Sequence, residues 1–163
     1  MGEAVLFESA VICEYLDEVH PPSLHPADPL RKAVNRAWVE FSSELFVDLY
    51  RLATAAEREA FETSRRAARE KLERLEGQVG GPYFNGSGFS LVDAVIAPAF
   101  MRIALMEEVR PMGLLEGLPK VQRWSDSLLE RESVRTSVVA EFIALFRDYL
   151  AAGGGYLAQG EHG

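Results

Sequence analysis

The sequence predicts an all-α protein, a helical bundle preceded by one short strand and one helix. Three observations predict this fold class. Apolar residues recur at steps of three and four along most of the chain, which is the period of a helix. The segment 91–106 is apolar almost all round, as in the central helix of a bundle. A proline-rich segment at 20–29 separates the bundle from the residues before it.

The composition excludes several classes of function. The chain has 163 residues with 48% hydrophobic content, enough for one domain or for one domain with part of another. Its net charge of −8 argues against a broad surface for nucleic acid or for an anionic membrane. A single cysteine excludes an internal disulfide and fits the reducing cytoplasm, and the three histidines lack metal-ligand spacing. We therefore expect a cytoplasmic protein without nucleic-acid, membrane or metal partners.

The first elements are a strand end and a helix. Val5 to Phe7 have the character of the last residues of a strand, and the helix that follows runs from Glu8 to Leu16. A strand needs a neighbour for its backbone hydrogen bonds, and the sequence before Val5 provides none. Cys13 lies in this helix, where packing as a small side chain is favoured over a reactive thiolate.

The next helix follows a linker with four prolines between His20 and Pro29, which no helix tolerates. We expect this helix from Pro29 to about Leu52, with one apolar stripe for the core. It also carries a second stripe. That stripe indicates either a wider core face or a ligand cleft or subunit contact, and the pattern does not choose between them. The second stripe consists of Val39, Phe46 and Tyr50.

A third helix is predicted from Thr54 to about Val79. Thr54 and Glu57 have the spacing of a capping box, in which each side chain satisfies a backbone N–H of the helix start. Most of this helix is charged and therefore solvated. The glycine-rich segment 80–88 after it is a loop, and it lacks the lysine and preceding strand of a nucleotide-binding P-loop.

The central helix is predicted from Leu91 to Met106, with a capping box at its start. The Ser90 hydroxyl can accept from the Asp93 amide, and the Asp93 carboxylate can reach back to the Ser90 amide. A general base is the alternative role for Asp93, and the buried cap is favoured. Pro98 lies inside the helix and predicts a kink.

Two helices complete the bundle. One begins after Pro119 and faces the core with Val121, Trp124 and Leu128. The other is predicted from about Ser133 to Leu150, with one apolar face. The glycines at 153–155 end this helix, and we expect the tail from 153 to 163 to be flexible.

Four segments, in order, resemble the cytosolic glutathione transferase superfamily, and together they span nearly the whole chain. The specific ones are FESAVICEYLDE, similar to the Glu-Ser signature that ends the thioredoxin-like domain, and FSLVDAVIAP, similar to the N-capping box of the helical domain. The other two are DPLRKAVNRAW and LPKVQRWSDSLLERESV. The resemblance implies the fold of the glutathione transferase C-terminal helical domain.

This resemblance divides the chain into four parts. Residues 1–20 correspond to a remnant of the thioredoxin-like domain, 21–28 to a linker, 29–152 to the helical domain and 153–163 to a tail. In the family, the rest of the first domain holds the catalytic Tyr, Ser or Cys and the cis-proline that pairs with glutathione. The resemblance therefore implies an N-terminally truncated chain that lacks its catalytic residue and is inactive alone.

The resemblance also implies a function for the parent protein. Glutathione is its co-substrate, and it conjugates or reduces small electrophiles without a permanently bound cofactor. Its partners are the small electrophile and a second copy of the chain, in a homodimer. The alternative is a non-catalytic interaction or regulatory module built on the same helical domain, as in relatives of the family.

The candidate binding residues follow from the matched motifs. Glu8 and Ser9 match the pair that holds the γ-glutamyl end of glutathione. The chemistry fits, because free amides at a helix start favour a carboxylate and Glu8 can receive an ammonium group. The helix start at Ser9 would thus bind the carboxylate of the ligand, and the Glu8 side chain would bind its ammonium group.

Two further sets of residues complete the candidates. Ser90 and Asp93 match the structural capping box of the family and not its chemistry. Trp38, Phe41 and Met101 are candidates for the second-substrate pocket, on the basis of the helix faces they occupy.

Overall fold

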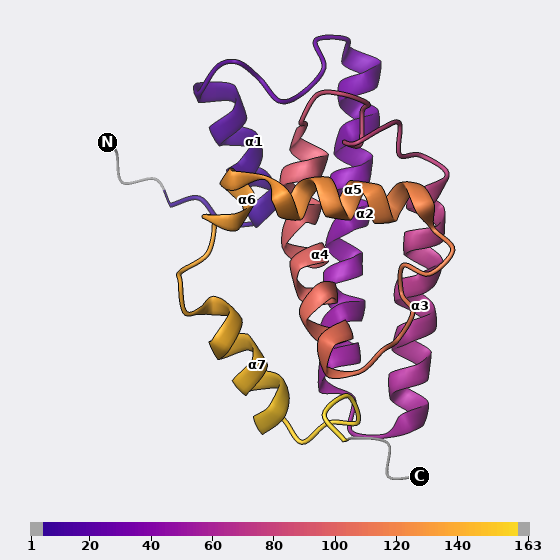
Figure 1. Ribbon diagram of the computed structural model, residues 1–163. Coiled ribbons are helices and arrows are strands. Elements are labelled where there is room, and N and C mark those ends of the chain that lie inside the picture. The colour runs from indigo at the N-terminus through magenta and orange to yellow at the C-terminus, as the bar shows by residue number, and fades with distance from the viewer. Residues whose placement is uncertain (1–4, 160–163) are drawn as a thin grey trace.

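The computed structural model describes residues 5–159 and confirms the all-α prediction, with helices and no strand in that range. Figure 1 labels the helices along the chain. Their bounds are α1 Ser9–Val19, α2 Pro29–Thr54, α3 Arg58–Glu76, α4 Leu91–Val109, α5 Pro119–Glu130, α6 Glu132–Arg135 and α7 Phe142–Ala152.

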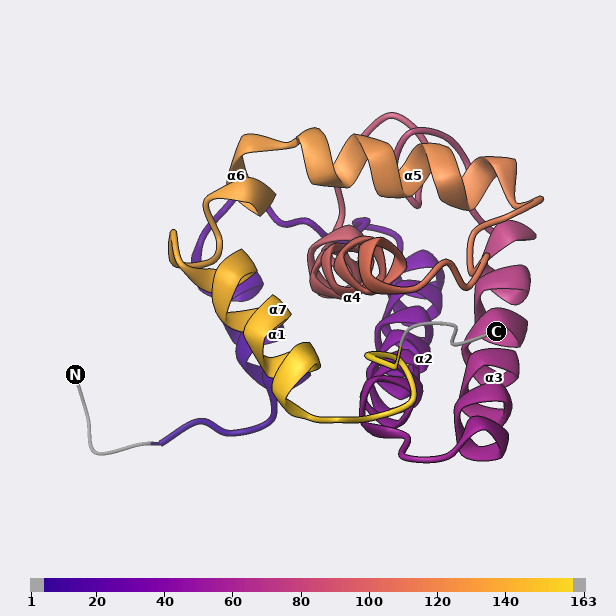
Figure 2. The same cartoon turned by 60° about the horizontal axis from the view of Figure 1, so that its bottom comes forward.

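The centre of the bundle is the pair α2 and α4, which run side by side (Figures 1 and 2). Helix α3 packs on the other side of α2, and α5 crosses the bundle and contacts both α3 and α4. The core lies among these four helices. Its largest fully buried side chains include Trp124, Phe100, Leu45, Leu72, Ile96 and Ile103.

The start of α2 agrees with the prediction and the start of α3 does not. Asp28 caps α2 by accepting from the Arg31 amide at 2.8 Å, and Pro29 takes the first helical position. Thr54 was expected to open the following helix with a capping box, and this is wrong. Thr54 is the last residue of α2 and donates its hydroxyl to the Tyr50 carbonyl at 2.8 Å, so α3 begins at Arg58.

The expected strand at Val5 to Phe7 is also wrong. These three residues have no regular secondary structure, and their side chains are exposed. A strand is held by hydrogen bonds to a neighbouring strand, and residues 5–159 contain none beside which these residues could pair. The helix predicted after them is present as α1.

The last predicted helix is divided in two. Helix α6 ends at Arg135, where the hydroxyls of Thr136 and Ser137 donate to carbonyls of the preceding turn and so compete with helix continuation. Helix α7 starts at Phe142 and stands at the periphery of the bundle (Figure 1). Leu145, which belongs to the apolar face of the predicted helix, is exposed, whereas Leu150 is buried.

The segment after α7 packs onto the bundle, where a flexible tail was expected. The Tyr156 amide donates to the Ala55 carbonyl at 2.7 Å, and Leu157 is 2% exposed. A side chain at Gly155 would approach the Ala55 carbonyl to 3.0 Å, so only glycine fits this contact without a shift. Residues 160–163 of the predicted tail lie outside the described residues.

Candidate ligand-binding sites

The first candidate site is the start of α1. Glu8 precedes the helix with φ 67° and ψ 115°, and among residues 5–159 it is the one residue other than glycine with positive φ. Such a conformation costs about 1–3 kcal/mol and gathers at functional sites. Among residues 5–159, no side chain caps the first amides of α1, and both Glu8 and Ser9 are exposed. These amides are therefore open to a ligand carboxylate.

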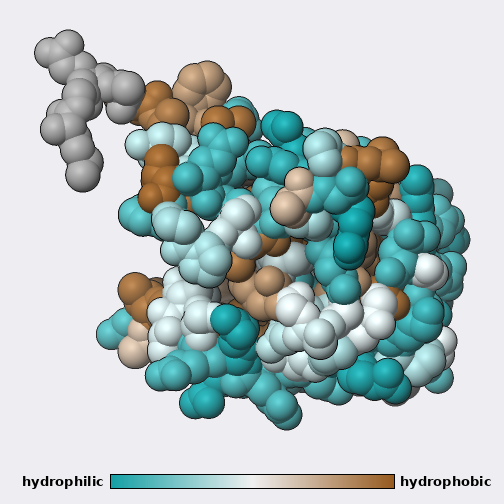
Figure 3. Space-filling model, turned by 90° about the horizontal axis from the view of Figure 1, so that it is seen from above, coloured by the Kyte–Doolittle hydropathy of each residue, from teal (hydrophilic) through white to brown (hydrophobic). Residues whose placement is uncertain are grey.

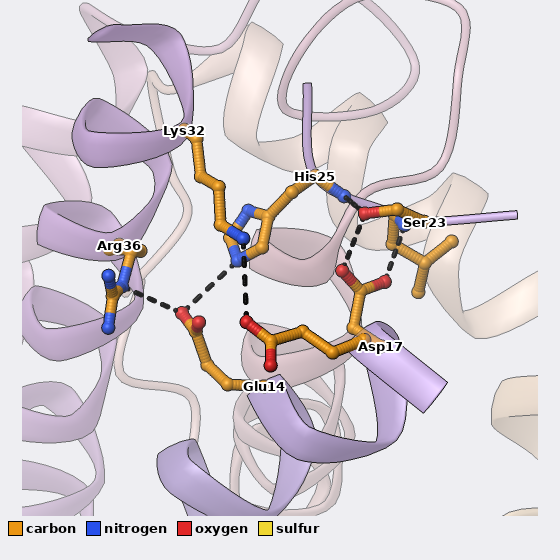
Figure 4. Close-up of polar contacts among 8 residues, drawn as sticks. Glu14, Asp17, Ser23, His25, Lys32 and Arg36 are labelled. Atoms are coloured by element: carbon orange, nitrogen blue, oxygen red, sulfur yellow. Dashed lines mark hydrogen bonds and ion pairs between the residues drawn. The ribbon is translucent and has the colours of Figure 1, made fainter. Parts of the chain in front are cut away.

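An ionic cluster holds α1 against the start of α2 (Figure 4). The Glu14 carboxylate is bonded to His25 Nε2 at 3.1 Å and to Arg36 Nε at 3.0 Å. Glu14 lies on α1, His25 in the linker and Arg36 on α2, so one side chain joins all three. Glu18 of α1 adds a longer pair to Lys32 of α2, at 3.8 Å.

Asp17 fixes the linker to the same helix. Its carboxylate accepts from the Ser23 hydroxyl at 2.7 Å and from the Leu24 amide at 2.5 Å (Figure 4). Burial alone raises the pKa of Asp17, but the hydrogen bonds from Ser23 and Leu24 and the nearby His25 outweigh it and lower this pKa below 3.8. Asp17 is therefore ionised at neutral pH and holds α1 in place.

Cys13 lies on α1 but does not have the properties of a reactive thiol. It is half-buried, and burial raises the pKa of its thiol above the ordinary value of 9.0. A nucleophilic cysteine needs a lowered pKa, so Cys13 is protonated at neutral pH. Packing as a small side chain, favoured from the sequence, agrees with this.

The capping box at the start of α4 contains a buried carboxylate, Asp93, and both oxygens of this carboxylate accept hydrogen bonds. Asp93 is fully buried, and the Ser90–Asp93 capping box is present. Asp93 Oδ1 accepts from the Phe84 amide at 2.8 Å and from Trp124 Nε1 at 2.6 Å. Asp93 Oδ2 accepts from the Ser90 amide at 2.7 Å and from its hydroxyl at 2.5 Å. This geometry favours the structural cap over a general base, because both oxygens are occupied within the core.

An apolar pocket of about 180 Å³ lies between α2, α4 and α7, and we call it the α7 pocket. Its walls are apolar or aromatic, and within residues 5–159 Arg102 of α4 is the one charged residue that lines it. The lining residues are Phe46, Leu49, Tyr50, Ala53, Arg102, Met106, Phe146 and Tyr149.

The three residues predicted for a second-substrate pocket do not line the α7 pocket. Trp38 and Phe41 pack edge to face, with ring centroids 5.1 Å apart. The Arg74 guanidinium of α3 lies 4.9 Å from the Phe41 ring centroid, so this pair faces α3. Met101 is half-buried against the core.

The sequence contained two signals for the α7 pocket. The first is the second stripe of α2, whose members divide between two roles: Val39 is buried in the core, and Phe46 and Tyr50 line the pocket. The second is Arg102, the one charged residue between Asp93 and Glu107. The contribution of α7 had no signal, because the predicted last helix placed its apolar residues on one continuous face.

No helix within residues 5–159 combines the length and the apolar character needed to cross a membrane. The same residues bring no group of three or more His, Cys, Asp or Glu side chains into a metal-binding arrangement.

These features define an all-helical domain of the type that glutathione transferases carry at their C-terminal side. Residues 45–127 match the family described as Glutathione S-transferase, C-terminal domain. The chain is 30% identical to glutathione S-transferase U19 of Arabidopsis thaliana over 148 residues, which are 86% of this chain and 68% of that protein. The chain belongs to the cytosolic glutathione transferase superfamily and is a glutathione transferase-like protein.

Solved structures agree with this assignment. Glutathione transferase Omega 3C from Trametes versicolor has a TM-score of 0.72 and 32% identity, covering 79% of this chain and 60% of that one. Rice GST1 in complex with glutathione has a TM-score of 0.72 at 22% identity, covering 91% of this chain and 71% of that one, and it supports the fold alone. The chain thus spans about two thirds of the length of these relatives.

Proposed function

We propose that the protein takes part in the glutathione-dependent conjugation or reduction of small electrophiles. Glu8 and Ser9 hold the γ-glutamyl end of glutathione in this proposal. The observation that carries it is the positive φ of Glu8 directly before the uncapped start of α1. The names of the relatives support the co-substrate.

The chemistry of this end of glutathione matches the start of α1. The γ-glutamyl group has one carboxylate and one ammonium. The carboxylate is received by the free amides and the Ser9 hydroxyl, where the helix dipole is favourable. The ammonium is received by the Glu8 carboxylate in a charge-assisted hydrogen bond. The cluster around Glu14 and Asp17 keeps α1 in position for this contact.

Glutathione binding is tested by NMR titration of the isotope-labelled protein. We expect glutathione to shift the amides of Ser9 and the residues after it, and Ser9→Ala to weaken the effect. Ser87→Ala is the matched control, because Ser87 is an exposed loop residue outside this site. Cysteinylglycine, which lacks the γ-glutamyl group, should leave these amides unchanged. Equal shifts from cysteinylglycine and glutathione would contradict the proposal.

The residue that activates the thiol of glutathione belongs, in this proposal, to the thioredoxin-like part of the enzyme. The 163 residues by themselves therefore do not accelerate conjugation, because a nucleophile needs a positioned activator. A chromogenic conjugation assay checks this. A rate well above the uncatalysed reaction would show that an activator lies within these residues.

We place the second substrate in the α7 pocket in preference to the region of Trp38, Phe41 and Met101. The α7 pocket is concave and apolar, which are the properties of a site for a small organic molecule. Trp38 and Phe41 instead lie under the Arg74 side chain.

A non-catalytic interaction module is the second candidate, and the exposed apolar surface at α1 and the start of α2 favours it. Figure 3 shows hydrophobic side chains gathered at the surface near the start of the described chain. Surfaces of this kind mark contacts with another domain or another chain. The exposed residues there are Val5, Leu6, Phe7, Val11, Tyr15, Leu16, Val19, Leu30 and Val34.

The same surface supports a homodimer, which we propose as the state of the protein in the cytoplasm. A symmetric pair is the commonest closed assembly. Light scattering over a dilution series tests this, and a monomer at micromolar concentration would refute it. A mass that keeps rising with concentration would indicate open aggregation. A dimer that gives no glutathione shifts would favour the interaction module over the enzyme.

A further inference from the structure

Arg102 is the one charged residue among the described residues that line the otherwise apolar α7 pocket. It lies on α4 between residues that are nearly all apolar, and it is half-buried. Three aromatic rings surround its guanidinium carbon. Their centroids lie at 5.8 Å (Phe46), 5.5 Å (Phe142) and 5.9 Å (Phe146), which is within the range of a cation–π contact. The cation is thus held in position by α2 and α7.

The guanidinium of Arg102 has no carboxylate partner among residues 5–159. Its one acceptor in that range is the Pro98 carbonyl, which accepts a hydrogen bond from Nη1 at 2.8 Å. A guanidinium has five N–H groups, so most of them are left for another acceptor. Burial lowers the pKa of Arg102 below its usual value, and the side chain nevertheless stays charged at neutral pH.

The acidic residues closest to Arg102 along α4 are engaged elsewhere. Glu107 accepts from the amides of Met112 and Leu114, at 2.7 Å and 2.9 Å, and so closes the turn after α4. Glu108 pairs with Arg147 of α7. The pair of Glu108 and Arg147 shows that α4 and α7 do form an ion pair. This pair lies at exposed residues and does not involve Arg102. Arg102 therefore remains as a charge for which the pocket itself offers no anion.

The size of the pocket limits what it can hold. Its volume is about 180 Å³. A dry apolar cavity of about 150 Å³ binds benzene, so the α7 pocket has room for about one aromatic ring. Tyr50 and Tyr149 are half-exposed or more at its edge, which leaves a way in from solvent.

We propose that the α7 pocket selects a small aromatic molecule that carries a carboxylate, with the ring between α2 and α7 and the carboxylate on Arg102. This rests on the proposed function, in which the same pocket takes the second substrate, and it names the chemical class of that substrate. A carboxylate matches the fork of the guanidinium in a bidentate pair. An uncharged ring of the same shape removes water from the guanidinium without replacing those hydrogen bonds, which is a penalty.

The selection is local, because the protein as a whole repels anions. The net charge of −8 gives no long-range attraction for a carboxylate. Preference for the anion therefore depends on one residue, and changing that residue should abolish it.

The test compares phenylacetate with phenylacetamide, which have nearly the same shape and differ in charge. Both are titrated into the isotope-labelled protein and followed by the amide signals of α7. We expect phenylacetate to bind about ten-fold more tightly, which corresponds to about 1.4 kcal/mol. In Arg102→Gln the two affinities should become equal. Arg131→Gln is the matched control, because the Arg131 guanidinium also lies over a ring, that of Phe89, but outside the pocket.

Two results would overturn the proposal. Equal affinities for the two ligands in the unaltered protein would do so, and so would a preference for phenylacetate that persists in Arg102→Gln. The first comparison needs no variant, so it decides the question even where Arg102→Gln does not fold. The glutathione titration at Ser9 is independent of both ligands. Glutathione shifts without a phenylacetate preference would remove this inference alone and leave the proposed function standing.

Discussion

The two halves of α4 each contain one charged side chain in an apolar sequence, and the two charges are treated in opposite ways. Asp93, in the first turn, is fully buried and accepts from the Phe84 amide, the Trp124 indole and Ser90. Arg102, further along, is half-buried and has one carbonyl as its acceptor within residues 5–159. The first charge joins parts of the fold, and the second belongs to a residue that lines a pocket.

The difference teaches how to distinguish a structural charge from a functional one. A buried carboxylate is tolerated when its lone pairs are satisfied, and removing it then strands the donors. Asp93 connects α4, the loop before it and α5 in this way. A cation without an anion contributes little to the fold, and we propose that its free donors receive a ligand. Four variants test this contrast, from the largest expected effect to the smallest.

Asp93→Asn should have the largest effect. The substitution replaces one carboxylate oxygen with an NH₂ group, which donates and cannot accept. This NH₂ group then meets either the two donors of Ser90 or the donors of Phe84 and Trp124. We expect the free energy of unfolding in urea to fall by about 3–5 kcal/mol, the range for breaking a buried charged network. Asp126→Asn is the control, because this exposed residue accepts from Gln122 of its own helix and from no other side chain in the described part of the chain. A loss similar to that of the control would show that the network is not structural.

Ser90→Ala should have the next largest effect. It removes the hydroxyl that donates to Asp93 Oδ2 but keeps the backbone amide that donates to the same oxygen. The free energy of unfolding should fall by about 1–2 kcal/mol, which is typical of a lost N-cap. The measurement is again urea unfolding. An unchanged midpoint would mean that the cap at the start of α4 contributes nothing.

Asp17 lies between these two cases. Its carboxylate accepts hydrogen bonds, as that of Asp93 does, but from the linker at the edge of the fold and not within the core. Hydrogen bonding lowers its pKa below 3.8 in the folded protein. Its contribution to stability is therefore present above about pH 4 and is lost as the pH falls through the lowered pKa. We expect amide exchange in α1 to accelerate over that acid range, before α4 is affected. Asp17→Asn should show fast exchange in α1 at every pH, and a normal acid dependence in this variant would contradict the assignment to Asp17.

Arg102→Gln should have the smallest effect on stability. The variant loses cation–π contacts but also removes a partly buried, unpaired charge, so the free energy of unfolding should change by less than about 1 kcal/mol. The relevant comparison is with Asp93→Asn on the same helix. A loss as large as that of Asp93→Asn would make Arg102 a structural residue and would remove the contrast between the two halves of α4.

The start of α4 was predictable because its parts are close in sequence. Ser90 and Asp93 lie three residues apart, and their spacing alone indicates a capping box. The bonds from Phe84 and Trp124 to Asp93 were not predictable, because one donor lies in a loop and the other on α5. The prediction of a strand at Val5 to Phe7 was wrong because a strand depends on a partner. The residue types favour a strand, but the described residues contain no partner strand for it.

The sequence by itself determined the all-α class, the starts of α2, α4 and α5, the capping box at Ser90 and the resemblance to the family. All of these follow from spacing within one helix or one motif. Tertiary structure alone decided three features: the division of the last helix into α6 and α7, the hydrogen bond from Tyr156 to Ala55, and the α7 pocket that Arg102 lines. Each of these depends on contacts between segments far apart in the chain, and helical period describes which face of a helix is apolar without saying which segment covers it.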